Sequence, residues 1–279
     1  RMADIAHHAG ISYHMRSWAI DEQPDAQTVK AILQENKSIT HVAMVHSETT
    51  SGILNDVQSI GRVVKEAGAT FIVDAMSSFA GVDIPVREWG IDCIISSANK
   101  CIQGVPGFAY VIVRKDLLAA CEGNARSLSL DLYDQWKTMN VDGKWRFTSP
   151  THVVLAFAKA MEELETEGGI AARHERYAAN EKLLCKKLSA LGFIPFLEQD
   201  VQGPIITTFY YPAGCNFSFH EMYDYIKERG YILYPGKTTK AETFRVGNIG
   251  EIYREDIDKL ADLLSDFLDS KHNLQAKGA

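Results

Sequence analysis

Several patterns are missing from this 279-residue sequence, and each absence narrows the class of protein. No apolar run approaches the roughly 20 residues that a membrane-spanning helix needs, so we expect no part of it to cross a bilayer. No Gly-x-Gly-x-x-Gly fingerprint is present, which leaves a nucleotide-dependent oxidoreductase as a weak alternative. Tyr223 and Lys227 have the Tyr-x-x-x-Lys spacing of short-chain dehydrogenases, but they lie on a helix that we expect to be exposed.

Cysteine is scarce and scattered. The five cysteines stand at positions 93, 101, 121, 185 and 215, with no Cys-x-x-Cys pair. This odd and dispersed set argues against a zinc site and against a disulfide framework, and it makes a reducing cytoplasm the expected compartment. Cys101 follows Lys100, but no histidine is near it in sequence, so we interpret it as a small packing residue rather than a nucleophile.

Positive charge is also in deficit. Lys and Arg number 29 against 36 Asp and Glu, which gives a net charge of −7 and a pI near 5.7. Such a chain offers no general attraction for nucleic acid or for an anionic membrane, so an anionic substrate would need a local cluster of basic side chains. Hydrophobic residues make up 46% of the sequence, enough for a sizeable core in one large domain or two smaller ones.

The first part of the chain alternates between strand and helix patterns. Residues 1–8 carry no signal-peptide pattern and resemble the last turns of a helix. Strand, helix, strand in sequence predicts parallel pairing with right-handed crossovers. The predicted helices are 24–35 and 57–67, and the predicted strands are 39–45, 70–73, 91–95 and 108–113, the last running back beside its predecessor.

The second part begins with a segment, 133–147, that is aromatic and poorly periodic, and we predict a loop there. Gly168-Gly169 breaks the helix pattern, which predicts a large domain over 1–169 and a small C-terminal domain over 170–279. A polar tail, 270–279, is expected to fray. The predicted helices are 151–167, 170–191, 219–229 and 257–268, and the predicted strands are 205–210, 231–234 and 243–246.

Two apolar runs are followed by residues with ionisable side chains. The runs 71–79 and 94–100 are typical of buried strands, and they deliver Asp74 and Lys100 to the edge of a sheet where ligands collect. Pyridoxal phosphate needs a lysine for its Schiff base and a carboxylate that keeps its ring nitrogen protonated. From the residues alone, a solvated loop lysine and an aspartate that caps the next helix explain the pair equally well.

Longer motifs favour the cofactor. The runs 46–52, 73–78 and 96–107 resemble the class V, fold-type I pyridoxal-phosphate aminotransferases, and the runs 126–136, 144–152 and 244–251 match the same family. The resemblance implies an α/β fold with a mostly parallel central sheet flanked by helices and a smaller C-terminal α+β domain. It also implies that the chain lacks roughly the first quarter of the family's length, which holds the turn and helix N-terminus that cradle the cofactor phosphate.

The resemblance assigns catalysis to Lys100 and Asp74. Lys100 would form the Schiff base and shuttle a proton between the substrate Cα and cofactor C4′, and Asp74 would hold the ring nitrogen. Met76 would point to the same side as Asp74 and pack on the ring, unless it serves only the core. Thr49 would bond the phenolic oxygen, unless it caps the next helix, and Asn99 would lie near the phosphate.

Two further residues would complete the site. Thr148 resembles the threonine that reaches the partner subunit's cofactor phosphate, which implies a homodimer with shared active sites. Arg245 would grip the substrate carboxylate with its planar guanidinium. The alternative for Arg245 is an ion pair with a local acid, Glu242 or Glu251.

Within the family, the motifs look closest to the enzymes that move the amino group of 2-aminoethylphosphonate to pyruvate, giving phosphonoacetaldehyde and L-alanine. One pocket would then accept a phosphonate and a carboxylate in turn, with Arg245 serving both and Lys144, Arg146 or Arg126 helping to bind the phosphonate. Two alternatives stay open: another class V enzyme of the alanine:glyoxylate or serine:glyoxylate type, and an inert chain that only dimerises.

Overall fold

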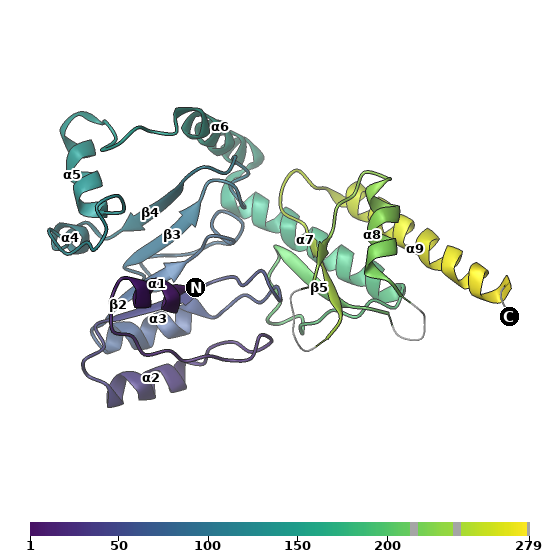
Figure 1. Cartoon of the computed structure of the whole chain (residues 1–279), viewed down its shortest axis with the longest axis horizontal. Helices are drawn as coiled ribbons and strands as arrows, with labels where there is room; N and C mark the ends of the chain where they lie inside the picture. Colours follow the sequence, from purple (N-terminus) through teal and green to yellow (C-terminus); the bar gives the residue numbers. More distant parts are fainter. Residues whose placement is uncertain (213–216, 237–240, 278–279) are drawn as a thin grey trace.

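A computed structural model describes residues 1–212, 217–236 and 241–277, and it contains two separate sheets (Figure 1). The first sheet has the order β1-β2-β3-β4. Its first three strands pair in parallel and the fourth returns antiparallel beside β3, as predicted. The strands are β1 (His41–Val45), β2 (Thr70–Asp74), β3 (Cys93–Ser97) and β4 (Ala109–Val113).

Helices α2 (Ala26–Glu35) and α3 (Val57–Glu66) pack on the first sheet and on each other, close to their predicted bounds. Each begins at an aspartate, Asp25 or Asp56, whose side chain accepts a hydrogen bond from a backbone N–H of the first turn. Their apolar faces and strands β2 and β3 form one buried core, which includes Leu33, Val57, Ile60, Val64, Phe71, Val73 and Ile94.

The second sheet is antiparallel, with the order β5-β7-β6. Helices α7, α8 and α9 pack against it around a second core, which includes Leu184, Leu188, Phe193, Phe209, Met222, Phe244 and Leu264. This is the α+β arrangement expected of the C-terminal part. The elements are β5 (Ile206–Tyr210), β6 (Tyr234–Pro235), β7 (Thr243–Gly247), α7 (Gly169–Ala190), α8 (Phe219–Lys227) and α9 (Arg254–Lys277).

Helix α7 extends from the loops of the first sheet to the core beneath the second sheet (Figure 1). It follows α6 (Thr151–Glu167) through Gly168, whose φ of 112° lies in the left-handed region that favours glycine. The predicted domain boundary near Gly169 coincides with this turn. It stays a prediction, because the first half of α7 packs against the first sheet's loops and the second half against the C-terminal core.

Three predictions of local structure are wrong. Part of the predicted loop 133–147 is helix α5 (Leu132–Asp142), capped by Asp131 and ended by Gly143. Because α5 buries none of its residues, no apolar stripe marks it in the sequence. The predicted strand 231–234 is reduced to the two residues of β6, and α9 continues to Lys277 instead of ending at Leu268.

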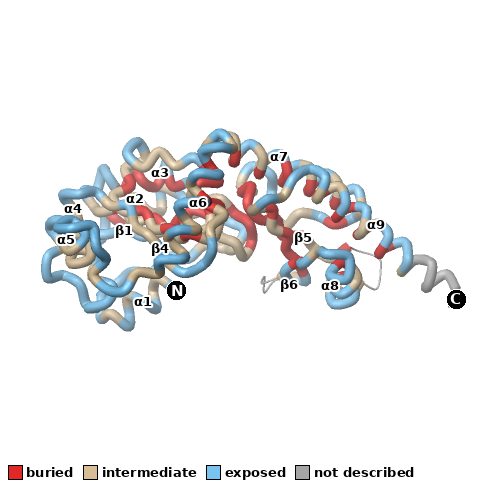
Figure 2. Tube along the Cα trace, turned by 90° about the horizontal axis from the view of Figure 1, so that it is seen from above, coloured by how far each residue is buried: buried red, intermediate tan, exposed pale blue. Residues whose placement is uncertain are grey.

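The buried residues concentrate in the two cores and along α7, whereas the short helices α1 (Met2–His8) and α4 (Lys115–Ala119) and helix α5 have no buried residue (Figure 2). Among the described residues, no helix is both long and apolar enough to span a bilayer.

Gly61 lets α3 approach the segment that precedes β3. A Cβ atom built on Gly61 would lie 1.9 Å from the carbonyl oxygen of Trp89. Alanine is a better helix former than glycine by about 1 kcal/mol, but this contact forces α3 or the Trp89 segment to move. We expect Gly61→Ala to lower the free energy of unfolding by about 1–3 kcal/mol, measured by urea denaturation. Gln58→Ala, on the exposed side of α3, should leave it nearly unchanged, and equal stability of the two variants would contradict this packing.

Candidate active site

Asp74 and Lys100 lie at the same edge of the first sheet. Asp74 is the last residue of β2, and Lys100 follows the end of β3 by three positions. These strands are parallel neighbours, with Asp74 opposite Ile95, so both chain segments leave the sheet at its carboxyl edge. The segment after β1 leaves the sheet here too, because Val45 lies opposite Asp74.

The loop that carries Lys100 has a fixed backbone and an open side chain. The Gln103 N–H donates to the Lys100 carbonyl at 2.8 Å, and the Gly104 N–H donates to that of Ala98 at 2.9 Å. Gln103 has a φ of 65°, a conformation that a non-glycine residue adopts at a cost. The half-buried Lys100 amine has no hydrogen-bond or ion-pair partner within 1–212, 217–236 and 241–277. A nucleophile or cofactor anchor needs such an amine.

Cys101 ties this loop to the segment that follows Asp74. Its thiol is fully buried and donates to the Ser77 carbonyl at 3.0 Å. Burial raises the pKa of Cys101 to about 12, so the thiol stays protonated at neutral pH. This agrees with the interpretation of Cys101 as a packing residue.

Asp74 keeps one carboxylate oxygen available. Its Oδ1 accepts a hydrogen bond from the Met76 N–H at 2.9 Å, and no residue in the described part of the chain bonds Oδ2. The same bond corrects the reasoning about Met76: β2 ends at Asp74 and residues 76–78 form a turn, so the side-chain alternation of an extended strand does not apply to Met76. Met76 itself is half-buried.

A buried histidine, which the sequence did not single out, joins two of these segments. The His46 N–H donates to the Asp74 carbonyl at 2.9 Å, and its ring Nδ1 lies 2.9 Å from the Ser78 hydroxyl. Burial lowers the pKa of His46 to about 4, so the ring is neutral at pH 7. The only sequence signal is its position directly after the strand β1, inside the matched run 46–52.

Arg245 comes to this edge from the second sheet. It is 6% exposed, and its Nη1 donates to the Thr49 carbonyl at 2.9 Å while Nε donates to the Pro235 carbonyl at 3.1 Å. No carboxylate of the described residues lies within ion-pair distance, so the alternative pairing with Glu242 or Glu251 is wrong. Burial lowers the pKa of Arg245, but a guanidinium remains charged at neutral pH.

The loop that carries Thr49 is held by the C-terminal part of the chain. The Thr208 hydroxyl donates to the Thr50 carbonyl at 3.3 Å, and the Gly203 N–H donates to the Gly52 carbonyl at 2.9 Å. The alternative role of Thr49 as a helix cap is wrong, because Asp56 caps α3. The Thr49 hydroxyl has no partner among the residues that the structure places.

Asn99 and Thr148 differ in their surroundings. Asn99 is half-buried in the turn before Lys100, and Thr148 is exposed in the segment between α5 and α6. Neither side chain has a hydrogen bond within the described ranges. Thr148 is therefore free to contact a second molecule, and within the described ranges no hydrogen bond joins it to the Lys100 loop.

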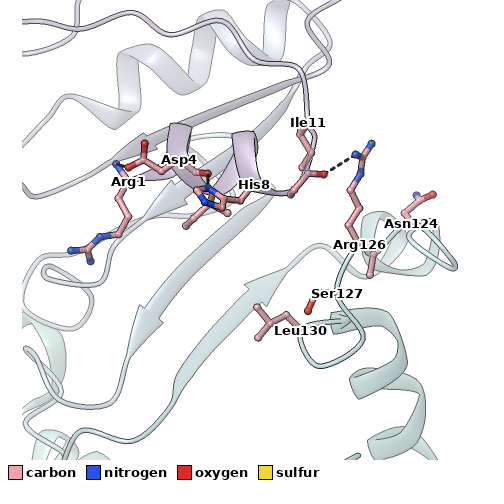
Figure 3. Close-up of a pocket in the computed structure, with 11 residues that line it drawn as sticks. Arg1, Asp4, His8, Ile11, Asn124, Arg126, Ser127 and Leu130 are labelled. Carbon is pink, nitrogen blue, oxygen red and sulfur yellow. Dashed lines mark hydrogen bonds and ion pairs between the residues drawn. The ribbon is translucent and has the colours of Figure 1, made fainter.

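The basic residues expected to help with a phosphonate are engaged elsewhere. Lys144 pairs with Asp142 at 2.8 Å, and Arg146 pairs with Asp134 at 3.0 Å. Arg126 reaches across to the end of α1, where it donates to the carbonyls of Ala9 and Gly10 beside a surface pocket (Figure 3). Among the described residues, none of the three forms a hydrogen bond or ion pair with the segment of Arg245.

The polar groups at the sheet edge fit pyridoxal phosphate. The Lys100 amine, the second oxygen of Asp74, the Thr49 hydroxyl and the Asn99 amide all lack partners within the described chain. Other polar side chains near this edge, those of His46, Ser78, Ser96 and Cys101, have hydrogen-bond partners, whereas the buried Ser47 hydroxyl has none among the described residues. An amine, a carboxylate and neutral donors left open at the carboxyl edge of a parallel sheet are the set that this cofactor requires.

Comparisons with known proteins agree with this geometry. The family model for aminotransferase class-V matches residues 2–255. The chain is 51% identical over 273 residues to a 2-aminoethylphosphonate–pyruvate transaminase of Lysinibacillus sphaericus, with 98% of this chain and 74% of that protein covered. It is 52% identical over 261 residues to the enzyme of the same name from Salmonella typhimurium, with 93% and 71% covered.

Solved structures show the same fold. The ureidoglycine–glyoxylate aminotransferase of Bacillus subtilis superposes with a TM-score of 0.86 at 23% identity, covering 97% of this chain and 70% of that one. An alanine–glyoxylate aminotransferase from Nostoc sp. superposes with a TM-score of 0.84 at 22% identity, covering 95% of this chain and 71% of that one. At these identities the likeness concerns the fold alone.

His46 should make the stability of the protein depend on pH. Its pKa falls from 6.5 in the unfolded chain to about 4 in the folded protein, so the unfolded state binds the proton more readily. The stabilisation is present above pH 6.5 and is lost as the pH falls toward 4, by up to about 3 kcal/mol. Urea unfolding from pH 7 to 4 should show a shallower decline for His46→Gln than for the wild type. Parallel pH profiles would show that His46 is not buried in the neutral form.

Proposed function

The chain belongs to the aminotransferase class-V family, whose members depend on pyridoxal phosphate, and from this premise we propose that it transfers the amino group of 2-aminoethylphosphonate to pyruvate. The products are phosphonoacetaldehyde and L-alanine. The observation that carries the proposal is the placement of Asp74 and Lys100 at one sheet edge with open polar atoms. The choice of substrates is supported by the names of the relatives, which are about half identical in sequence.

Lys100 and Asp74 have complementary tasks. Pyridoxal phosphate, when bound, supplies an electron sink that stabilises the carbanion formed next to the amino group. The Lys100 amine would hold the cofactor and, when free of it, would take the proton from the carbon that bears the amino group of the donor. In the second half of the reaction it returns a proton to the Cα of alanine. The Asp74 carboxylate would keep the ring nitrogen protonated, and the hydroxyl of Thr49 and the amide of Asn99 would donate to the cofactor's oxygens.

Arg245 orients both substrates. Its Nε and one Nη1 proton are used by the carbonyls of Pro235 and Thr49, which hold the guanidinium in one orientation. The remaining N–H groups can grip the carboxylate of pyruvate and, in the other half-reaction, the phosphonate of the donor. Tyr234 is the cross-strand neighbour of Arg245, and its ring centroid lies 5.7 Å from the Arg245 Cζ.

A homodimer with shared active sites is part of the proposal. Helix α5 and the segments that flank it present exposed apolar side chains, such as Leu130 at 78% and Val141 at 82%. Thr148 lies in this region with an open hydroxyl, where it can reach the cofactor phosphate of a second subunit. The cysteines in the described ranges are free thiols, which supports a reducing compartment such as the cytoplasm.

Replacing Lys100 tests the transaminase reaction. In the full-length protein with pyridoxal phosphate, Lys100→Ala should lower the rate of alanine formation from 2-aminoethylphosphonate and pyruvate by about 10³-fold or more, because both the anchor and the proton carrier are lost. The visible absorbance of the bound cofactor should shift as well. Lys115→Ala, at an exposed position, is the matched control.

Three results would be informative against the proposal. If the protein binds the cofactor but does not react with 2-aminoethylphosphonate, the role of Lys100 stands and the proposed amino donor is wrong. Transamination of glyoxylate would then indicate another class V enzyme. Failure of this 279-residue chain to bind the cofactor would favour the alternative of an inert chain that only dimerises. Unchanged activity of Lys100→Ala would remove Lys100 from the mechanism.

Replacing Arg245 tests substrate orientation. A lysine keeps the charge but cannot make the planar two-point contact, so Arg245→Lys should lower kcat/KM for pyruvate and for 2-aminoethylphosphonate by roughly 10- to 100-fold each. The loss should appear mainly in KM, measured by steady-state kinetics with either substrate varied. Arg254→Lys on the exposed start of α9 should have no such effect. A loss for one substrate only would show that Arg245 does not serve both.

A further inference from the structure

Arg173 is a charged residue in the interior that the proposed reaction does not use. It lies in the first half of α7 and is only 2% exposed. A buried guanidinium is costly unless its donors are satisfied, so its partners show what it is there to hold.

The partners on one side of Arg173 are the two residues that follow Lys100. Its Nη1 donates to the carbonyl of Cys101 at 2.9 Å and to that of Ile102 at 3.3 Å. These carbonyls belong to the turn in which the Gln103 N–H bonds the Lys100 carbonyl. The guanidinium therefore holds the backbone one residue away from the proposed catalytic lysine.

The partner on the other side is Glu167, the last residue of α6. Nε and Nη2 of Arg173 both donate to Glu167 Oε2, at 2.8 and 2.6 Å. Burial would raise the pKa of Glu167, but the hydrogen bonds from Arg176 and Arg173 lower it below its ordinary value, so the group is a carboxylate at neutral pH. Arg173 thus shares the Glu167 carboxylate with Arg176, and the Lys100 loop offers it only backbone carbonyls.

We propose that Arg173 is a positioning residue that fixes the backbone after Lys100 and so sets the location of the Lys100 amine. The inference deepens the proposed transaminase function and rests on it. It follows from the geometry that Glu167 anchors the guanidinium from the end of α6, and that the guanidinium in turn restrains a loop whose non-glycine residue Gln103 sits in a strained conformation.

Arg176 is a matched control on the same helix. Its Nε donates to the other oxygen of Glu167 at 2.8 Å, but its Nη1 donates to the carbonyls of Gly250 and Ile252 in the C-terminal part of the chain. Replacing either arginine by lysine keeps the charge and removes the planar donor pattern. A loss of packing alone should affect the two variants alike, whereas positioning of Lys100 should be lost only in Arg173→Lys.

Hydrogen exchange measured by mass spectrometry tests the restraint without reference to activity. In the full-length protein, with and without pyridoxal phosphate, Arg173→Lys should speed exchange in a peptide covering 98–107 by about 10-fold or more, because the amides of Gln103 and Gly104 lose their support. Arg176→Lys should speed exchange near 248–253 and leave 98–107 close to the wild type. Glu167→Gln provides a second variant with an intermediate effect on 98–107 if Arg173→Lys does not fold.

Steady-state kinetics tests the consequence for catalysis. We expect Arg173→Lys to lower kcat by about 10- to 100-fold while KM for pyruvate changes less than about twofold, because Arg245 is untouched and a displaced amine transfers protons slowly. Arg176→Lys should keep kcat within about threefold of the wild type. Arg173→Met should lower kcat more than Arg173→Lys does, since the lysine amine can still donate to one of the loop carbonyls.

Two outcomes would overturn the inference: unchanged exchange of 98–107 in Arg173→Lys, or equal losses of kcat in the two lysine variants. Failure of the proposed function is distinguishable, because wild-type protein would then form no alanine from 2-aminoethylphosphonate while the exchange experiment would still report whether Arg173 restrains the loop.

Discussion

The parallel pairing of β1, β2 and β3 is the constraint on which the site depends. Parallel strands point their carboxyl ends to one edge, so the segments with Thr49, Asp74 and Lys100 all leave the sheet together although they are far apart in the sequence. The two intervening connections, which include α3 and the segment before β3, are packed as the hydrophobic core of this unit. The packing that holds these strands together therefore also places the site segments at one edge of the sheet.

Each loop at that edge is held by a group from another part of the chain. His46 holds the turn after Asp74, Cys101 links that turn to the Lys100 loop, and Arg173 holds the same loop from α7. Arg245 holds the Thr49 loop from the second sheet. Hydrogen bonds thus restrain the backbone of these loops, while the side chains of Lys100 and Thr49 have no partner among the described residues. A site for a covalently held cofactor requires both conditions.

Charge is used locally in this protein. The chain is negative overall, so it exerts no long-range attraction on anions. In the proposed function, anion binding falls instead to the buried guanidinium of Arg245, whose charge interacts more strongly there than in water. Carbonyl oxygens orient both Arg173 and Arg245, but Arg173 also pairs with Glu167, whereas Arg245 has no carboxylate within ion-pair distance among the described residues.

The elements with strong periodicity and the order of the motifs along the chain follow from the amino-acid sequence alone. Strands around Asp74 and Lys100, helix α3 and helix α6 follow from apolar patterns that report burial, and the long matched runs indicated the family. Helix α5 escaped prediction because it buries nothing, and the length of α9 because its polar end has no apolar repeat. Only the tertiary structure decided the partners of His46, Arg173 and Arg245, since hydrogen bonds between residues 32, 72 and 196 positions apart depend on packing and leave no local pattern.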